Sequence, residues 1–133
     1  MEQSASALNK LTEQIIGAAI HVHRTLGPGL LESAYEICLY QELLTRGLKV
    51  ERQKPLPLVY SAIALDCVYR VDIVVEAAVV VEVKSVTRFD RVHEAQMVSY
   101  LKLSKKCVGL LINFNVRVLA ETGIKRLVNG FPG

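Results

Sequence analysis

The sequence predicts an α/β fold in which helices flank a central mixed β-sheet, in the order ααβββαββ. Apolar residues recur at helical spacing near the N-terminus, as expected for amphipathic helices. Residues 69–86 carry two valine-rich runs around a short break, which predicts two antiparallel strands. The apolar run at 107–114 follows a helical stretch, which favours a parallel crossover into the same sheet. The length of 133 residues predicts one domain spanning 1–133.

The composition is that of a globular protein in a reducing compartment. Hydrophobic residues make up 51% and charged residues 22%, and the net charge of +3 permits a polyanionic partner without requiring one. Cys38, Cys67 and Cys107 are far apart and form no CxxC, so neither a zinc knuckle nor a disulfide framework is supported. We find no signal peptide and no apolar run near the ~20 residues of a membrane span. A cytoplasmic protein is therefore expected.

Two helices are expected first, over 6–25 and 30–46. Glycine and proline at 27–29 end the first helix, and Gly47 ends the second. Glu32 lies in the first turn of the second helix. Taken alone, an acid there is more often a cap that satisfies free N–H groups than a catalytic residue.

The remaining helices and strands are predicted from hydrophobic periodicity and from the turn residues between the periodic segments. Strands are expected at 49–60, 66–75, 79–86, 107–114 and 124–128, a helix at 89–103, and a frayed tail at 129–133. Pro55 and Pro57 confine the first strand to a sheet edge or a bend. Asp90 is a plausible N-cap for the third helix.

The hairpin over 69–86 carries the main chemical signal. If its loop is centred on Ala77, Asp72 lies opposite Glu82, and Arg70 lies opposite Lys84. The other face is then purely apolar and consists of Val71, Ile73, Val75, Val79, Val81 and Val83. Like charges placed directly opposite are destabilising, so two facing carboxylates indicate a bound cation. The alternative is a solvated patch in which Arg70 and Lys84 neutralise the two acids.

Three polar residues share one stripe of the third helix: His93, Gln96 and Tyr100. Gln96 and Tyr100 are either satisfied polar groups in the core or the lining of a groove.

These blocks resemble the PD-(D/E)XK nuclease superfamily, with Asp72 followed by Glu82-Val83-Lys84 across a hairpin and Val71 in place of the proline. The segment Gly29-Leu-Leu-Glu32-Ser-Ala-Tyr35 also matches the GxxExxY family signature. The resemblance runs from about residue 20 to 129 and implies a restriction-endonuclease-like core.

The resemblance also implies roles for individual residues. Asp72 and Glu82 would hold a divalent metal, Mg²⁺ or Mn²⁺, and Lys84 would orient or activate the attacking water. Glu32 would be a third acid. Gln96 and Tyr100 resemble the QxxxY element of RecB-type nucleases and, with Arg70, would contact the substrate.

The leading hypothesis from the sequence is a Mg²⁺-dependent nuclease that hydrolyses phosphodiester bonds in DNA or RNA, with nucleic acid as its partner. The rival is a catalytically silent module on the same fold, which either binds nucleic acid or serves oligomerisation and interaction. The modest net charge slightly favours the rival. A homodimer is compatible with so small a chain, although no residue demands one.

Overall fold

The computed structural model describes residues 4–133, with only the backbone of residues 66–68. Helices α1 (Ala5–Leu26) and α2 (Glu32–Thr45) precede strands β1 (Val50–Tyr60), β2 (Ile63–Val75) and β3 (Val79–Lys84). Then come helix α3 (Arg91–Ser104), strand β4 (Val108–Asn113), a π-helical turn η1 (Leu119–Gly123) and strand β5 (Ile124–Val128). The predicted order of helices and strands is confirmed, and only the η1 turn was not expected.

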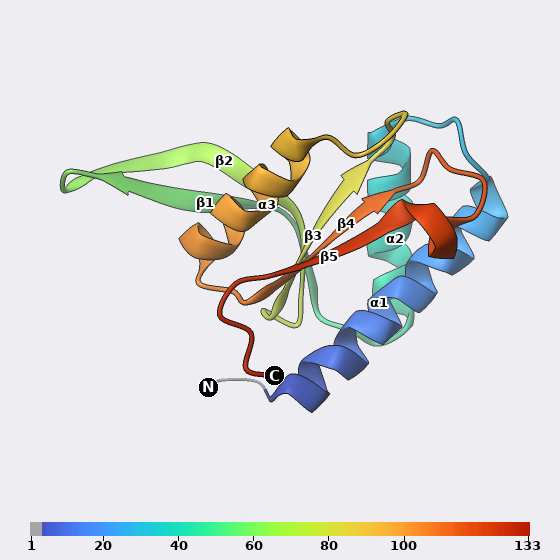
Figure 1. The fold of residues 1–133 in the computed structure, drawn as a ribbon, viewed down its shortest axis with the longest axis horizontal. Helices are drawn as coiled ribbons and strands as arrows, with labels where there is room; N and C mark the ends of the chain where they lie inside the picture. Colours follow the sequence, from blue (N-terminus) through green and yellow to red (C-terminus); the bar gives the residue numbers. More distant parts are fainter. Residues whose placement is uncertain (1–3) are drawn as a thin grey trace.

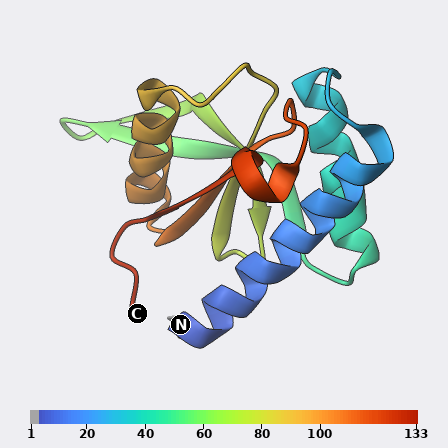
Figure 2. The same cartoon turned by 45° about the vertical axis from the view of Figure 1, so that its right-hand side comes forward.

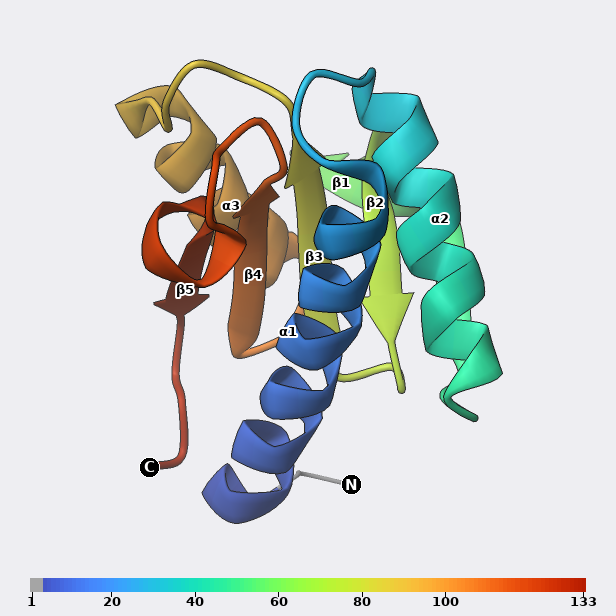
Figure 3. The same ribbon diagram turned by 90° about the vertical axis from the view of Figure 1, so that its right-hand side faces the viewer.

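The five strands form one mixed sheet in the order β1-β2-β3-β4-β5. β3 and β4 run parallel, joined by the crossover through α3, whereas the other neighbouring pairs are antiparallel. Helices α1 and α2 cover one face of the sheet, and α3 lies against the other (Figures 1 and 3). The expected layers of helix, sheet and helix are therefore present.

The core is divided between the two faces of the sheet. Beneath α1 and α2, a cluster of buried residues includes Ile73, Val75, Val81 and Val83. Beneath α3, a second cluster joins Val71, Val74, Val80, Met97, Tyr100, Leu101 and Leu111. The prediction that Val71 shares the face of Ile73 and Val75 is wrong, because the strict alternation of β2 ends near Asp72.

Local sequence signals explain the helix ends. Gly27 adopts a φ of 71° at the end of α1, a conformation that glycine tolerates without steric cost. The Asp90 side chain accepts a hydrogen bond from the Val92 N–H at 3.1 Å, so the predicted cap of α3 is confirmed. His93 completes a capping box, with its Nδ1 accepting from the Asp90 N–H at 3.0 Å.

Strands β1 and β2 form a long hairpin that reaches beyond the rest of the fold (Figures 1 and 2). Its tight turn is Ser61-Ala62, with φ angles of 47° and 66°. These residues lack the glycine or asparagine that usually marks such a turn, so the sequence does not indicate it. As a result, β2 begins three residues earlier than predicted. β1 is an edge strand, as its two prolines indicate.

The C-terminal tail is held in place, so the expectation that it frays is wrong. The Asn129 N–H donates to the Cys107 carbonyl at 2.9 Å, and the Arg126 guanidinium lies 4.5 Å from the centre of the Phe131 ring. In the part of the chain described, no helix is long and apolar enough to cross a membrane.

Candidate active site

The two central carboxylates lie where strands β2 and β3 separate. Val75 pairs with Val79 and Val74 with Val80, as predicted, but the ladder ends at Ile73 and Val81. The predicted pairing of Arg70 with Lys84 is therefore wrong, because the strands have diverged by that point and the Arg70 backbone pairs with Pro55 on β1.

Side chains replace the missing ladder bonds at this fork. The Asp72 N–H donates to Glu82 Oε2 at 2.8 Å, and the Val83 N–H donates to Asp72 Oδ2 at 2.9 Å. Each acid thus caps a backbone N–H of the opposite strand, which would otherwise be unpaired in the core. The reciprocal bonds hold Asp72 and Glu82 beside each other, but the two are not the ladder pair that the sequence predicts, because the ladder ends one residue earlier.

Burial makes this pair electrostatically costly. Desolvation raises the pKa of Glu82 to about 8, and the charge of Asp72 adds to the rise. Desolvation likewise raises the pKa of Asp72 to about 6, against the opposing effect of the Val83 N–H. The metal-free pair therefore retains a proton near neutral pH.

Lys84 supplies positive charge beside the pair. Its ammonium lowers the pKa of both Asp72 and Glu82, although by less than burial raises it. Among the residues described, neither carboxylate forms a salt bridge. The alternative in which Arg70 and Lys84 neutralise the acids as cross-strand partners does not describe this site, since Glu82 is only 4% exposed.

A third acid approaches from α2, and it is Glu36. Arg52 Nη1 donates to Glu36 Oε2 at 2.8 Å, and Gln53 Nε2 donates to Glu36 Oε1 at 2.9 Å. Gln53 Nε2 also lies 3.4 Å from Asp72 Oδ1. The Glu36 charge contributes to the raised pKa of Asp72. Gln53 has a φ of 54°, and this kink in β1 lets two consecutive side chains reach the same carboxylate.

The sequence analysis did not single out Glu36. A signal was present: Glu36 lies three and seven residues before Leu39 and Leu43, and therefore on the buried stripe of α2. An acid on an apolar stripe requires a partner, and here Arg52 and Gln53 provide it.

Glu32, the expected third acid, makes a different contact. Glu32 Oε2 accepts a hydrogen bond from the Ser85 N–H at 3.2 Å, and Ser85 Oγ donates to the Leu30 carbonyl at 2.7 Å. These bonds attach the loop between α1 and α2 to the end of β3, directly after Lys84. They position Lys84 rather than bring a third carboxylate to the fork.

The other motif residues fix the same loop. Gly29 has a φ of 98°, which favours glycine. The Tyr35 hydroxyl donates to the Gly27 carbonyl at 2.5 Å and accepts from the Leu30 N–H at 3.1 Å. Its ring stacks on Phe114 at a centroid distance of 4.6 Å. The GxxExxY residues thus lock the start of α2 onto the sheet.

Asn113 secures the other side of the end of β3. Its Nδ2 donates to the Val86 carbonyl at 2.9 Å, and its Oδ1 accepts from the Val86 N–H at 3.1 Å. Asn113 is also the strand partner of Lys84 in the parallel β3–β4 pair. The sequence analysis did not identify this residue, which ends an otherwise apolar run.

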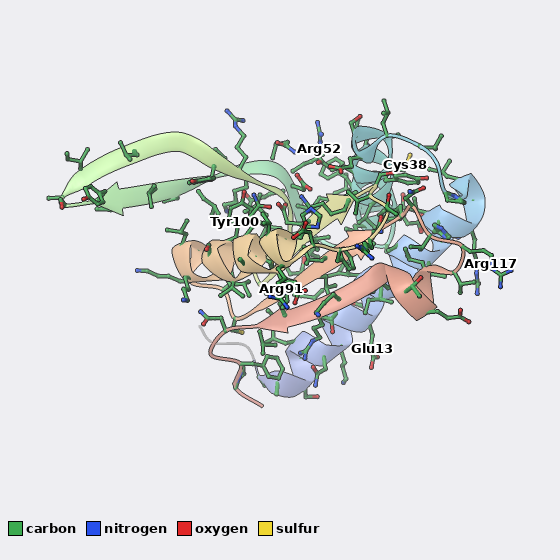
Figure 4. All side chains as sticks on the ribbon, turned by 45° about the horizontal axis from the view of Figure 1, so that its top comes forward. Glu13, Cys38, Arg52, Arg91, Tyr100 and Arg117 are labelled. Atoms are coloured by element: carbon green, nitrogen blue, oxygen red, sulfur yellow. The ribbon has the colours of Figure 1, made fainter. Side chains whose placement is uncertain are left out.

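The expected substrate-contacting residues come from strand β2 and helix α3. Tyr100, labelled on α3 in Figure 4, is mostly buried, and its ring lies 6.1 Å from that of Tyr69. Burial raises the pKa of Tyr100, and the charges of Glu82 and Asp72 add to the rise. Gln96 is half-buried one turn earlier, and Arg70 is exposed on β2.

Within the described residues, the fork offers a metal ion two carboxylates and no larger set of ligands. In the described part of the chain, no group of three or more His, Cys, Asp or Glu is arranged to hold a metal. Mg²⁺ is, however, often bound by one or two carboxylates, with waters and substrate phosphates completing the octahedron. Two buried, mutually repelling carboxylates fit that requirement, because a cation would relieve their repulsion.

A cavity of about 750 Å³ lies at the other end of β3, near Ala78, Lys105, Cys107 and Gly130. It contains neither fork carboxylate. We place the candidate chemistry at the fork because both acids with strongly raised pKa values lie there.

Comparison with known proteins identifies the family of the chain. The family model of the PD-(D/E)XK nuclease superfamily matches residues 9–127, which is most of the chain and includes both strands of the fork. Neither the curated proteins nor the solved structures gave a significant match.

Proposed function

The chain belongs to the PD-(D/E)XK nuclease superfamily, with a restriction-endonuclease-like fold, and we propose that it is a Mg²⁺- or Mn²⁺-dependent nuclease acting on DNA or RNA. Within the superfamily, we assign it to the GxxExxY family on the motif from Gly29 to Tyr35.

The observation that carries this proposal is the reciprocal capping at the fork. The two N–H bonds, at 2.8 and 2.9 Å, hold Asp72 and Glu82 together despite their repulsion. In the described part of the chain, Glu82 Oε1 takes part in no hydrogen bond, and Asp72 Oδ1 has only the 3.4 Å contact with Gln53. One oxygen of each acid is therefore left for a ligand.

Asp72 and Glu82 would hold the metal through these two oxygens. The bound ion supplies a Lewis acid that polarises a phosphoryl oxygen and lowers the pKa of a coordinated water. Lys84, held by the Ser85 and Val86 contacts of its loop, carries the positive charge that stabilises negative charge building on the phosphate or orients the water. Glu36 positions Asp72 through Gln53.

Three further residues are proposed to contact the nucleic acid. Arg70 is exposed on β2, two residues before Asp72, where its guanidinium can reach a phosphate. Tyr100 and Gln96 share one face of α3, and Tyr100 is within electrostatic range of both acids. The two residues would order the substrate backbone beside the carboxylates.

The test is cleavage of single- and double-stranded DNA and RNA with Mg²⁺ or Mn²⁺. Asp72→Asn, Glu82→Gln and Lys84→Ala are expected to lose activity. Glu13→Gln and Lys10→Ala, which change exposed residues on α1, serve as matched controls and are expected to keep it. Cleavage that persists in all three fork variants would assign it to another site or a contaminant.

Thermal unfolding distinguishes the nuclease from a catalytically silent module on the same fold. If Mg²⁺ binds the folded protein and not the unfolded chain, it raises the midpoint of thermal unfolding. An absent shift, together with retained oligonucleotide binding, would identify a non-catalytic nucleic-acid-binding module and refute the proposal.

We also propose a cytoplasmic location and a homodimer. Among the residues described, Cys38 and Cys107 are free thiols, which persist in a reducing compartment.

A further inference from the structure

The outer part of the β1–β2 hairpin, residues 58–65, is a two-stranded projection that we call the arm. It extends past α3, and its tip has no other element beside it in either view (Figures 1 and 2). An isolated two-stranded hairpin is only marginally stable in water, because it buries little apolar surface. The arm therefore needs cover from outside the described fold.

One face of the arm is a continuous apolar strip. Leu58 pairs with Leu65 and Tyr60 pairs with Ile63, so these four side chains project from the same face. The intervening Val59 points to the opposite face. Together the four side chains, Leu58, Tyr60, Ile63 and Leu65, form what we call the strip.

The strip begins next to the hydrophobic core. Leu56, two residues before Leu58 on β1, is 3% exposed because it packs in the cluster beneath α3, and the β1–β2 register shifts between Leu56 and Leu58. Farther out, Tyr60 is 69% exposed, Ile63 is 59% and Leu65 is 38%. Contiguous apolar surface of this kind marks an interaction site rather than the scattered apolar residues of an ordinary surface.

The charge pattern of the arm identifies its partner. The arm, LVYSAIAL (58–65), has no charged residue, although 22% of the chain is charged, so about two would be expected. A surface without cations is poorly suited to phosphates, which excludes nucleic acid as the primary occupant. In a twofold dimer, residues near the axis meet their own copies, so charges there would face like charges. A neutral apolar strip avoids that repulsion.

The prolines restrict how two copies can meet. Pro55 and Pro57 lie on the edge strand β1 and lack the N–H groups that strand addition needs. Contact is therefore through the strip and not through extension of the sheet.

We propose that the arm is a dimerisation clasp, in which the strip of one copy packs face to face on the strip of a second copy of this chain. This surface lies away from the fork carboxylates. Its test needs neither metal nor substrate, so it can fail while the proposed nuclease function stands, and the reverse also holds.

Sedimentation velocity across a wide dilution series tests the proposal. The wild-type protein is expected to sediment at twice 14.7 kDa. Ile63→Lys and Tyr60→Lys place a charge on the strip and are expected to give monomers. Val59→Lys changes an equally exposed residue on the opposite face of the same strand and is expected to leave the dimer intact.

A fluorescent variant covers the case in which the lysine variants misfold. The chain has no tryptophan, so Tyr60→Trp introduces a single emitter on the strip. Its emission is expected to be blue-shifted in the dimer and to move to the red on dilution. A wild-type monomer at every concentration, a dimer of Ile63→Lys that persists, or loss of the dimer in Val59→Lys would each overturn the proposal. A blue shift that appears only with lipid vesicles would assign the strip to a membrane surface and would also overturn it.

Discussion

Replacing Glu82 with glutamine is expected to make the metal-free protein more stable at alkaline pH. The glutamine amide keeps an oxygen that accepts the Asp72 N–H, a contact of 2.8 Å in the native protein. Its NH₂ group can donate to the Asp72 carboxylate, where the acid must share a proton. The variant therefore keeps the shape of the fork and removes one buried negative charge.

The magnitude follows from the raised pKa. Burial raises the pKa of Glu82 from 4.5 to about 8, and each pKa unit corresponds to about 1.4 kcal/mol. The full effect is about 5 kcal/mol, and relaxation of the fork reduces it to roughly 2–5 kcal/mol. Because the folded pKa lies above the unfolded one, this stability is fully present below pH 4.5 and is lost as the pH rises through about 8.

The assay is urea unfolding in EDTA, followed by circular dichroism, at about pH 5 and about pH 9. The wild-type protein is expected to lose stability between these values, whereas Glu82→Gln loses much less. Glu13→Gln removes an exposed acid on α1 (Figure 4) and is expected to follow the wild type, which controls for net charge. An equal pH dependence in the wild type and Glu82→Gln would refute the buried-charge reasoning.

Three further predictions concern the metal and the motif residues. Excess Mg²⁺ is expected to stabilise the wild type by about 2.7 kcal/mol at 100 times its Kd. The stabilisation should increase as the pH rises, because metal binding displaces the proton shared by the two acids. Asp72→Asn is expected to abolish the Mg²⁺-dependent shift in the melting temperature. Tyr35→Phe is expected to cost about 1–3 kcal/mol in urea unfolding, since it leaves the Leu30 N–H and the Gly27 carbonyl without their partner. Glu32→Ala is expected to slow cleavage while the Mg²⁺ shift is preserved, whereas a lost Mg²⁺ shift would make Glu32 a ligand rather than a positioning residue.

The hairpin register could be predicted because valine-rich alternation on both sides of a three-residue loop leaves little freedom. Val74 meets Val80 and Val75 meets Val79, as expected. The end of the ladder could not be predicted in this way. At Asp72, backbone carbonyls and side-chain carboxylates compete for the same N–H groups, and the outcome decides whether the strands remain paired. The alternation of apolar and polar residues contains no information about that outcome.

The surroundings of the pair were predicted less well, for two physical reasons. Glu36 lies on the buried stripe of α2, but its partners could not be predicted, because they reach it from β1 at Gln53, where a non-glycine residue adopts a positive φ. The Ser61-Ala62 turn likewise lacks the residues that favour its conformation, so the arm was not visible in the sequence. At Gln53, contacts with Glu36 and Asp72 override the local preference, and such conflicts are expected at functional sites.

The fork also explains why two acids remain in a valine-rich sheet at a cost in stability. Valines at both positions could extend the ladder and would carry no buried charge, so a chain selected for stability alone would favour them. With the acids present, the N–H groups of Asp72 and Val83 are each satisfied by a carboxylate, and one oxygen of each acid is not used in these two bonds. The same two hydrogen bonds therefore hold the two acids beside each other where the strands separate. For this reason we expect substitutions at the fork to separate folding stability from metal binding, and not to lower both together.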